Sequence, residues 1–388
     1  MPTPIIKAFK PGLLVAALAL ASMGSAHAQG YTATNLGTLG GINSYAFGIN
    51  DAGQLLGSVY AAGNAASRAT LWSGGTTTNL GTLGGTYSFG GDINNAGQAV
   101  GSATVTGNAA QHATLWSGGS TTDLGTLGGS DSYAHGINAA GQVVGSAQTR
   151  NNAEEHATLW SGGTATDLGT LGGRLSYARD INDAGQVAGY SYTTGDAAIR
   201  ATLWSGGKTT DLGTLGGAYS RALDINEGGQ VAGYAQTKGN AAYHATLWTG
   251  GKATDLGTLG GTSSFAYGVN DAGQVVGYSQ TTGNTAQHAT LWSGGSSIDL
   301  NSFLSLSDIN AGWVLTEASG INNHGWIAAT ATNSVTRATT AYLLSVTAVP
   351  EPGSYAMLLA GLGLLGGVAR RRQRQRQASG GVADGQGN

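Results

Sequence analysis

The chain has 388 residues, of which 68 are glycine, only 10% are charged and none is cysteine. Residues 29–349 hold 10 lysines and arginines against 18 aspartates and glutamates, so the body of the chain is mildly acidic and lacks a basic stripe. This charge pattern argues against nucleic acid as a partner, and the absence of cysteine excludes a disulfide framework.

The N-terminus carries an export signal. Lys7 and Lys10 precede an apolar run over residues 12–21, and Ala26-His27-Ala28 has the small-x-small form of a cleavage site. The run is too short to span a membrane comfortably. We therefore interpret residues 1–28 as a secretory signal peptide, with a short membrane anchor as the alternative.

A repeat of 44 residues follows. Its tryptophan recurs at this step at Trp72, Trp116, Trp160, Trp204, Trp248 and Trp292. An asparagine in the pattern G/D-I/V-N-x-x-G-Q keeps the same step at Asn50, Asn94, Asn138, Asn182, Asn226 and Asn270. Such self-similarity is typical of repeat architectures, and glycines at fixed phases within it indicate turns rather than disorder.

Each repeat predicts four short strands. In the repeat that begins at Ser132, these strands cover residues 132–138, 142–147, 156–160 and 164–171. Asn138-Ala139-Ala140-Gly141 predicts a type I turn closed by a glycine with positive φ, and Gly162-Gly163 predicts a second tight turn. No segment combines helical apolar spacing with a cap, so the expected fold class is all-β.

Four strands in 44 residues match one blade of a β-propeller. The mature chain opens with a single fourth strand, Tyr31–Gly41, and closes with three strands in residues 320–344. These fragments add up to one blade. They predict seven blades and a ring closed by pairing of the N-terminal strand with the C-terminal blade, which leaves no open edge. A β-solenoid is the alternative.

The last repeat departs from the pattern. Asn270 and Asn322 are 52 residues apart, and the segment reads DLNSFL…GWVLTEASGIN. With this ending, the repeats over about residues 31–345 resemble the HAF-repeat family of bacterial extracellular proteins. Thr114 and its equivalents stand where that family commonly has phenylalanine, and only Tyr342 keeps an aromatic residue there. The resemblance implies an extracellular location and names no substrate.

The C-terminus has three parts: Pro350-Glu351-Pro352, an apolar segment over residues 355–369, and the arginines Arg370, Arg371 and Arg372. An apolar run of about 15 residues is marginal for spanning a bilayer, and the arginines would keep the repeats on its far side. This order resembles the PEP-CTERM sorting signal of Gram-negative bacteria, here residues 349–376. The resemblance implies cleavage near Pro-Glu-Pro by an exosortase, a transient stay in the inner membrane and a producer of extracellular polysaccharide. The polar tail 377–388 departs from the family, and a plain tail anchor is the alternative.

Two polar positions recur without predicting a metal or cofactor. The first is occupied by His112, His156, His244 and His288, with Arg68 and Arg200 in other repeats. Because equivalent positions in different blades lie apart and arginine cannot ligate, we expect a ring of solvated side chains rather than a metal site. The second is occupied by Asp123, Asp167, Asp211, Asp255 and Asp299, for which we expect hydrogen bonds to backbone N–H groups at a turn.

A site on a repetitive scaffold must come from residues that break the repeat. The candidates are Asp131, His135, Glu154, Glu155, Arg174, Arg179, Asp180 and Arg221, but no nucleophile motif or diagnostic spacing accompanies them, and no catalytic residue is assigned. The loops between strands two and three and between repeats vary, whereas the other two turns do not. We therefore expect one uniform rim and one diverse rim, with recognition at the diverse rim. The residues that we place on this binding face are Tyr87, His135, Arg174, Arg179 and Arg221.

The sequence favours an exported binding or structural module of the cell surface or extracellular matrix. An extracellular polysaccharide is the expected ligand, and an exosortase is the expected processing enzyme. One alternative is a polysaccharide-active enzyme, a glycosidase or lyase, which a cleft lined by tryptophan and tyrosine with paired carboxylates would support. The other alternative is a purely structural envelope protein, which a featureless diverse rim would support.

Overall fold

The computed structural model of the chain describes residues 30–38, 41, 43–60 and 66–347. The signal peptide, the sorting signal with its apolar segment, and the polar tail, all predicted from the sequence, lie outside these residues. The described part is nearly all-β, as predicted. Its helices are one α-helix of five residues and a set of short 3-10 turns.

The strands are, in chain order, β1 (Gly30–Gly37), β2 (Ser44–Ile49), β3 (Leu55–Tyr60), β4 (Ser67–Ser73), β5 (Thr76–Asn79), β6 (Gly84–Ile93), β7 (Ala99–Val105), β8 (Gln111–Ser117), β9 (Ser120–Asp123), β10 (Gly128–Ile137), β11 (Val143–Thr149), β12 (Glu155–Ser161), β13 (Thr164–Asp167), β14 (Gly172–Ile181), β15 (Val187–Thr193), β16 (Ile199–Ser205), β17 (Lys208–Asp211), β18 (Gly216–Ile225), β19 (Val231–Thr237), β20 (Tyr243–Thr249), β21 (Lys252–Asp255), β22 (Gly260–Val269), β23 (Val275–Thr281), β24 (Gln287–Ser293), β25 (Ser296–Asp299), β26 (Trp313–Ile321), β27 (Ile327–Asn333) and β28 (Thr339–Thr347). The helices are η2 (Thr106–Asn108), η3 (Arg150–Asn152), η4 (Thr194–Asp196), η5 (Lys238–Asn240), η6 (Thr282–Asn284), η7 (Leu300–Phe303) and α1 (Leu306–Asn310).

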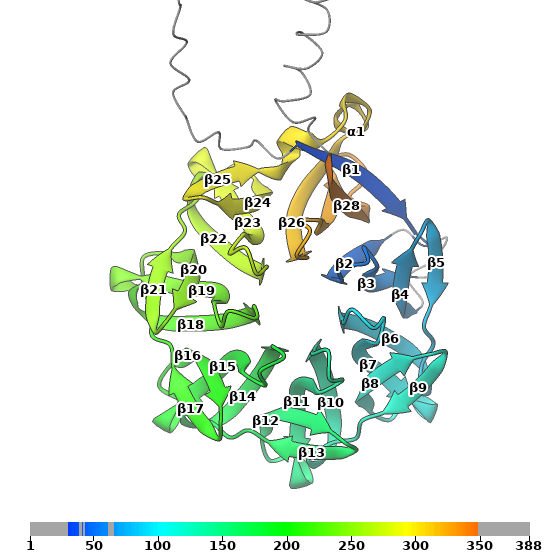
Figure 1. Cartoon of the computed structure of the whole chain (residues 1–388), viewed down its shortest axis with the longest axis vertical. Coiled ribbons are helices and arrows are strands. Elements are labelled where there is room, and N and C mark those ends of the chain that lie inside the picture. Colours follow the sequence, from blue (N-terminus) through cyan, green and yellow to red (C-terminus); the bar gives the residue numbers. More distant parts are fainter. Residues whose placement is uncertain (1–29, 39–40, 42, 61–65, 348–388) are drawn as a thin grey trace, which may run out of the picture.

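Four consecutive strands pair in antiparallel order, as in β6-β7-β8-β9, and we call each such group a unit. The units β10–β13 and β14–β17 count as one eight-stranded sheet through a single parallel pair, Glu155 with Leu175. The units follow one another around a ring, with the first strand of each nearest the centre and the last at the outer edge (Figure 1). A ring is incompatible with the β-solenoid alternative.

The first strand of the chain completes the last unit. β1 pairs antiparallel with β28 from Gly30–Thr347 to Gly37–Ala341, which gives the sheet order β1-β28-β27-β26. The predicted pairing of the N-terminal strand with the C-terminal strands is therefore confirmed. The strand ends at Gly37, earlier than the predicted Gly41, because Gly37 takes a φ of 69° and donates to the Asn35 side chain.

The repeated asparagines link the units into a cycle. The Asn50 side chain donates through Nδ2 to the Asn94 carbonyl at 3.0 Å, and each equivalent asparagine does the same to the next unit. The cycle runs through Asn50, Asn94, Asn138, Asn182, Asn226, Asn270 and Asn322, whose Nδ2 returns to the Asn50 carbonyl at 2.9 Å. These side chains thus join every unit to its neighbour near the ring centre.

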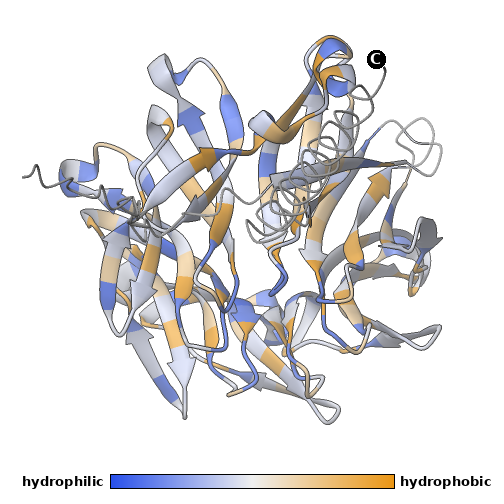
Figure 2. Cartoon of the chain, turned by 45° about the horizontal axis from the view of Figure 1, so that its top comes forward, coloured by the Kyte–Doolittle hydropathy of each residue, from blue (hydrophilic) through white to orange (hydrophobic). Residues whose placement is uncertain are grey.

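The cores lie between adjacent units, where small residues let two sheets approach closely. In one such core, Trp160 packs with Ala134 and Val143 of its own unit and with Val100 and Ala113 of the unit before it. Figure 2 shows the hydrophobic residues within the strands, with hydrophilic residues concentrated at the loops. The tryptophans at the 44-residue step are 1–4% exposed, so they stabilise the core and cannot line a binding cleft.

The strands differ from the sequence prediction at their ends. β10 begins at Gly128, earlier than the predicted Ser132, because Gly128 still pairs with Thr149 of the neighbouring strand. β13 ends at Asp167 rather than at residue 171. There the Asp167 carboxylate accepts the N–H of Gly169, whose φ of 75° turns the chain out of the sheet.

The two rims predicted from the repeats are present. The turns of the uniform rim include Asn138–Gly141, where Gly141 has a φ of 74° and donates to the Asn138 carbonyl, as predicted. At the opposite rim, the loop between strands two and three contacts the connection between units. Asn152 of η3, for example, accepts the N–H of Ser130 at 2.8 Å. Both variable loop sets therefore lie on one face, the diverse rim.

Candidate binding site

The first strands surround a central cavity of about 660 Å³. One variable position of these strands contributes Phe47, Gly91, His135, Arg179, Leu223, Tyr267 and Ser319 to its lining. At the uniform rim, its lining includes the carboxylates Asp51, Asp183, Glu227 and Asp271. The position that varies most along the first strand therefore faces the cavity, where its side chains are available to a ligand.

His135 and Arg179 meet in this cavity although they are 44 residues apart. Arg179 Nη1 lies 3.4 Å from His135 Nε2. Burial, together with the neighbouring Arg179 charge, lowers the pKa of His135 well below its usual value, so the imidazole is neutral near pH 7. Among the described residues that line the cavity, Arg179 is the only lysine or arginine.

Three aspartates link neighbouring units around the cavity. Asp92, Asp180 and Asp224 accept the backbone N–H groups of Ile137, Ile225 and Val269, each in the following unit. Burial raises the pKa of all three carboxyls, that of Asp92 to about 7. Asp180 and Asp224 also share a hydrogen bond. Of the three, sequence reasoning singled out only Asp180. For Asp92 and Asp224, the signal in the sequence was the repeat position before I/V-N, which holds glycine in some repeats and aspartate in others.

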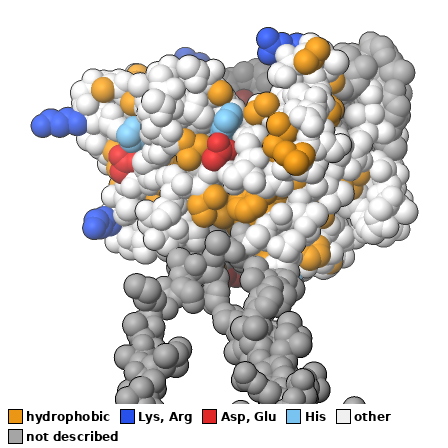
Figure 3. Space-filling view, turned by 90° about the horizontal axis from the view of Figure 1, so that it is seen from above, with side chains coloured by type: hydrophobic (Ala, Val, Ile, Leu, Met, Phe, Trp, Pro, Cys, Tyr) orange, Lys and Arg blue, Asp and Glu red, His pale blue; other side chains and the backbone are white. Residues whose placement is uncertain are grey.

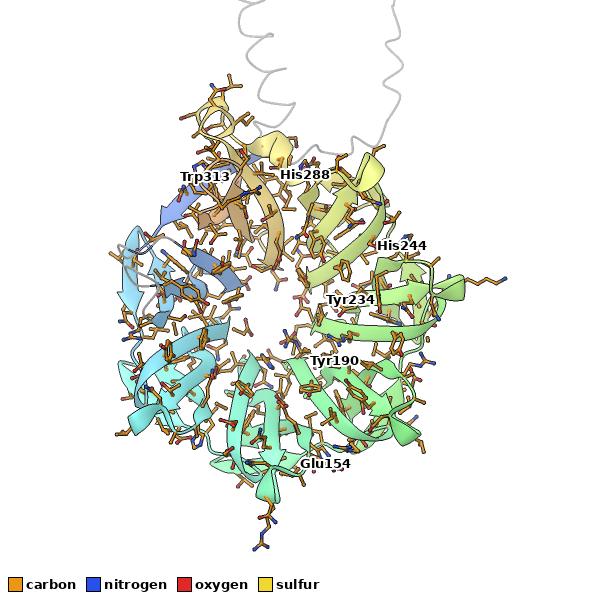
Figure 4. The ribbon with its side chains drawn as sticks, turned by 180° about the vertical axis from the view of Figure 1, so that it is seen from behind. Glu154, Tyr190, Tyr234, His244, His288 and Trp313 are labelled. Carbon is orange, nitrogen blue, oxygen red and sulfur yellow. The ribbon has the colours of Figure 1, made fainter. Side chains whose placement is uncertain are left out.

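A run of aromatic residues crosses three consecutive units. Tyr177 and Tyr190 stack at 5.0 Å, and the Arg221 guanidinium lies 4.6 Å from the centre of the Tyr190 ring. The run continues with Tyr234 against Phe265 at 4.7 Å and Phe265 against Tyr278 at 4.9 Å. We call this set, Tyr177, Tyr190, Arg221, Tyr234, Phe265 and Tyr278, the aromatic arc. Figure 4 shows Tyr190 and Tyr234 on adjacent units, near the ring centre.

The aromatic arc is a local break in the repeat. Tyr190, Tyr234 and Tyr278 occupy one position of the second strand, opposite Tyr177, Arg221 and Phe265 of the first. Other units carry Ser58, Ser102 and Ser146 at the same position. All six side chains of the arc are half-buried, so each keeps part of its surface accessible. Sequence reasoning found Arg221 but missed the tyrosines, whose pairing depends on strand register.

The structure separates the residues predicted for one binding face. His135 and Arg179 lie in the cavity, and Arg221 belongs to the aromatic arc. Tyr87, on β6, and Arg174, on β14, are exposed and touch neither group in the described contacts. Arg174 lies 4.0 Å from Glu154 instead.

The recurring histidines contact the recurring aspartates, a pairing that the sequence did not predict. His156 Nδ1 lies 2.7 Å from Asp167 Oδ2, and the same pair recurs as His112–Asp123, His244–Asp255 and His288–Asp299. Figure 3 shows histidine beside acidic side chains on the outer edge. The predicted turn role of the aspartates is confirmed, since Asp167 also accepts the Gly169 N–H. The part of the chain that the structure describes contains no group of three or more metal-ligating side chains placed to hold an ion.

Residues 348–373 match the PEP-CTERM protein-sorting motif. This motif marks an exported protein of Gram-negative type that an exosortase recognises, with membrane anchoring before sorting. No helix of the described segments has the length and apolar character of a membrane span.

Two solved structures are similar to this chain over three quarters of its length. TolB from Acinetobacter baumannii aligns with 10% identity over 75% of this chain and 63% of its own, with a TM-score of 0.40. Dipeptidyl peptidase 4 of Porphyromonas gingivalis aligns with 11% identity over 75% of this chain and 51% of its own, with a TM-score of 0.39. The chain thus spans less than two thirds of either. No curated protein matches it in sequence, and these comparisons place it in no enzyme family.

Proposed function

We propose that the protein is an exported seven-bladed β-propeller of the HAF-repeat type that binds extracellular polysaccharide at the cell surface. In this proposal, residues 29–348 form the propeller, and residues 1–28 and 349–376 direct export and sorting. The asparagine cycle supports the blade number, because it passes through seven equivalent side chains and returns to the first. The pairing of β1 with β28 supports ring closure.

The aromatic arc carries the binding proposal. Sugar rings present flat C–H faces that stack on aromatic rings, while tyrosine hydroxyls add hydrogen bonds. The arc places such rings on three consecutive blades, so it extends over several units as a polymer would. Because other blades carry serine at this position, the blade itself does not require tyrosine there.

The role of the aromatic arc in binding can be tested by substitutions to serine, the residue that other blades carry at the same position. Tyr190→Ser and Tyr234→Ser introduce the residue found at Ser58, Ser102 and Ser146 of other blades. Because energetic anchors are often aromatic, we expect each change to lower affinity for the producer's extracellular polysaccharide by about tenfold. Retention on the immobilised polymer measures the loss, beside thermal melting.

A matched control is Tyr219→Ser, which removes an exposed tyrosine outside the arc, at a position where another repeat has Ser263. It should bind as the wild type does. Arc variants that melt normally and bind as tightly as the wild type would contradict the polysaccharide function.

The sorting proposal has its own test. Replacing Pro350, Glu351 and Pro352 with alanine should leave the protein uncleaved in the membrane fraction, whereas deleting the polar tail 377–388 should not. Mass spectrometry of the mature protein and membrane fractionation measure both. A product of the triple variant that still ends near Val349 would exclude this motif as the signal.

A further inference from the structure

Arg179 has unused binding capacity inside the central cavity. Its Nε is buried and finds no hydrogen-bond acceptor among the described residues. Its Nη1 lies 3.4 Å from His135 Nε2, a weak contact with a neutral ring. None of the ion pairs found in the described part of the chain includes Arg179, although six aspartates line the same cavity. A buried N–H group without an acceptor is costly even on a half-buried arginine, so an anionic group from outside that accepts the Nε–H would stabilise this side chain.

The nearby carboxyls do not supply that anion. Burial raises the pKa of Asp180 well above its usual value, and its hydrogen bond with Asp224 raises it further. These shifts favour the protonated, neutral form of Asp180. Asp224 and Asp92 direct carboxylate oxygens to the backbone N–H groups of Val269 and Ile137. Each of these acids thus has its own hydrogen-bond partner, whereas the Arg179 Nε has none.

We propose that the central cavity binds the carboxylate of an acidic sugar, a hexuronate, on Arg179. This inference rests on the proposed polysaccharide function and names the ligand class. The guanidinium presents parallel N–H donors that match a carboxylate. The cavity, about 660 Å³, falls within the range of about 300–1,000 Å³ that small-molecule sites occupy. Tyr267, Phe47 and Leu223 add apolar wall for the sugar ring.

The charges at the uniform rim set the direction of entry. Asp51, Asp183, Glu227 and Asp271 line that end of the cavity, and each accepts a backbone N–H from the neighbouring unit. This collar of carboxylates repels an anion at short range. Because of this repulsion, we expect a hexuronate to enter the cavity at the end away from this collar.

Isothermal titration calorimetry on the full mature protein tests the proposal. The ligands are sodium glucuronate, glucose and a glucuronate oligomer. The wild type should bind glucuronate in a saturable way and at least about tenfold more tightly than glucose, since charge-assisted hydrogen bonds contribute about 1.5–3 kcal/mol. Arg179→Met should lose about tenfold in glucuronate affinity, and Arg179→Lys should retain part of it. The control Lys252→Met removes one positive charge from the exposed start of β21 and should bind as the wild type does.

The outcomes separate the two proposals. Equal binding of glucose and glucuronate, or wild-type affinity in a folded Arg179→Met, would overturn the acidic-sugar site. So would a wild type that does not bind glucuronate. If polysaccharide retention depends on the arc while Arg179→Met leaves glucuronate binding unchanged, the arc function stands and the cavity site fails. If glucuronate binds through Arg179 but the polymer is not retained, the polymer function fails and the site stands. If Arg179→Met does not fold, Arg179→Lys and the salt dependence of glucuronate binding to the wild type test the acidic-sugar site instead. Full affinity in Arg179→Lys together with binding that does not weaken with salt would overturn it.

Discussion

At the scale of single residues, the asparagine of the repeat performs two tasks at once. Asn182 accepts the N–H of Gln186 within its own turn, and its Nδ2 donates to the Asn226 carbonyl of the next unit. The side chain is 1% exposed, so water cannot replace these partners. The turn was predictable from the sequence, but the link was not, because its partners are 44 residues apart.

Replacing Asn182 with alanine should destabilise the protein by about 1–3 kcal/mol, since the Gln186 N–H loses its acceptor and the Asn226 carbonyl keeps only the Gly229 N–H of its two donors. Urea unfolding followed by tryptophan fluorescence measures the change. The neighbouring Asp183→Ala is the control, because Ala139 already occupies the equivalent position and the change should cost under about 1 kcal/mol. Equal losses for the two variants would contradict the role of the cycle.

Asp92 gives a prediction of pH dependence. Burial raises its pKa from 3.8 to about 7, so the folded protein holds a proton that the unfolded chain has released. Stability therefore falls as the pH rises from about 4 to about 7. Asp92→Asn keeps an acceptor for the Ile137 N–H and has no proton to lose. At pH 8 it should be more stable than the wild type by about 1–2 kcal/mol.

Urea unfolding between pH 4.5 and pH 8 measures this difference. The exposed Asp183→Asn serves as the control, because it makes the same chemical change on the uniform rim, outside the buried group of Asp92, Asp180 and Asp224. A gap between Asp92→Asn and the wild type that does not widen with pH would be evidence against a protonated Asp92.

The residues of the candidate site show where sequence reasoning stops. His135 and Arg179 stood out because they break the repeat. Their contact, however, depends on how closely the first strands approach the ring axis, which no local pattern encodes. The tyrosines of the arc were missed for a related reason. Tyr190 faces Tyr177 only because a bulge between Ala178 and Asp180 shifts the register of β14 against β15.

At the scale of strands and turns, the residues of the turns predicted the number and order of the strands in each repeat. The four-residue turns from asparagine to glycine, such as Asn138–Gly141, and the turns at paired glycines determine where the strands reverse. The number of strands per repeat could therefore be predicted from the positions of the glycines. The strand ends were less predictable. Hydrogen bonds such as that of Asp167 to Gly169 decide them, and several residue types could make such a bond.

The turn at Gly141 can be tested directly. Its φ of 74° is strained for any β-branched residue, so Gly141→Val should destabilise the protein by about 2–3 kcal/mol. Ala140→Val, one residue earlier and without a positive φ, should cost much less. Thermal melting compares them, and sugar binding should remain at wild-type affinity in both. A harmless Gly141→Val would mean that the turn relaxes readily.

At the scale of the whole molecule, stability depends on the contact between the two ends of the described chain. Deleting residues 30–37 removes β1 and exposes the edge of β28, and Tyr31, 7% exposed, leaves its core. We expect a loss of several kcal/mol and a tendency to associate through the open edge. Melting and light scattering measure these effects. A truncated monomer that melts with the wild type would show that closure is dispensable.

The pairing of Gly30 with Thr347 also places both ends of the described chain at one rim. The sorting motif begins at residue 348, directly after β28, whose last residues lie at the rim of the uniform turns. We therefore expect a chain tethered through this motif to hold the uniform rim towards the lipid and the variable loops away from it. The tether and any ligand of the diverse rim would therefore occupy opposite sides, so the protein could engage its ligand before it is released from the membrane.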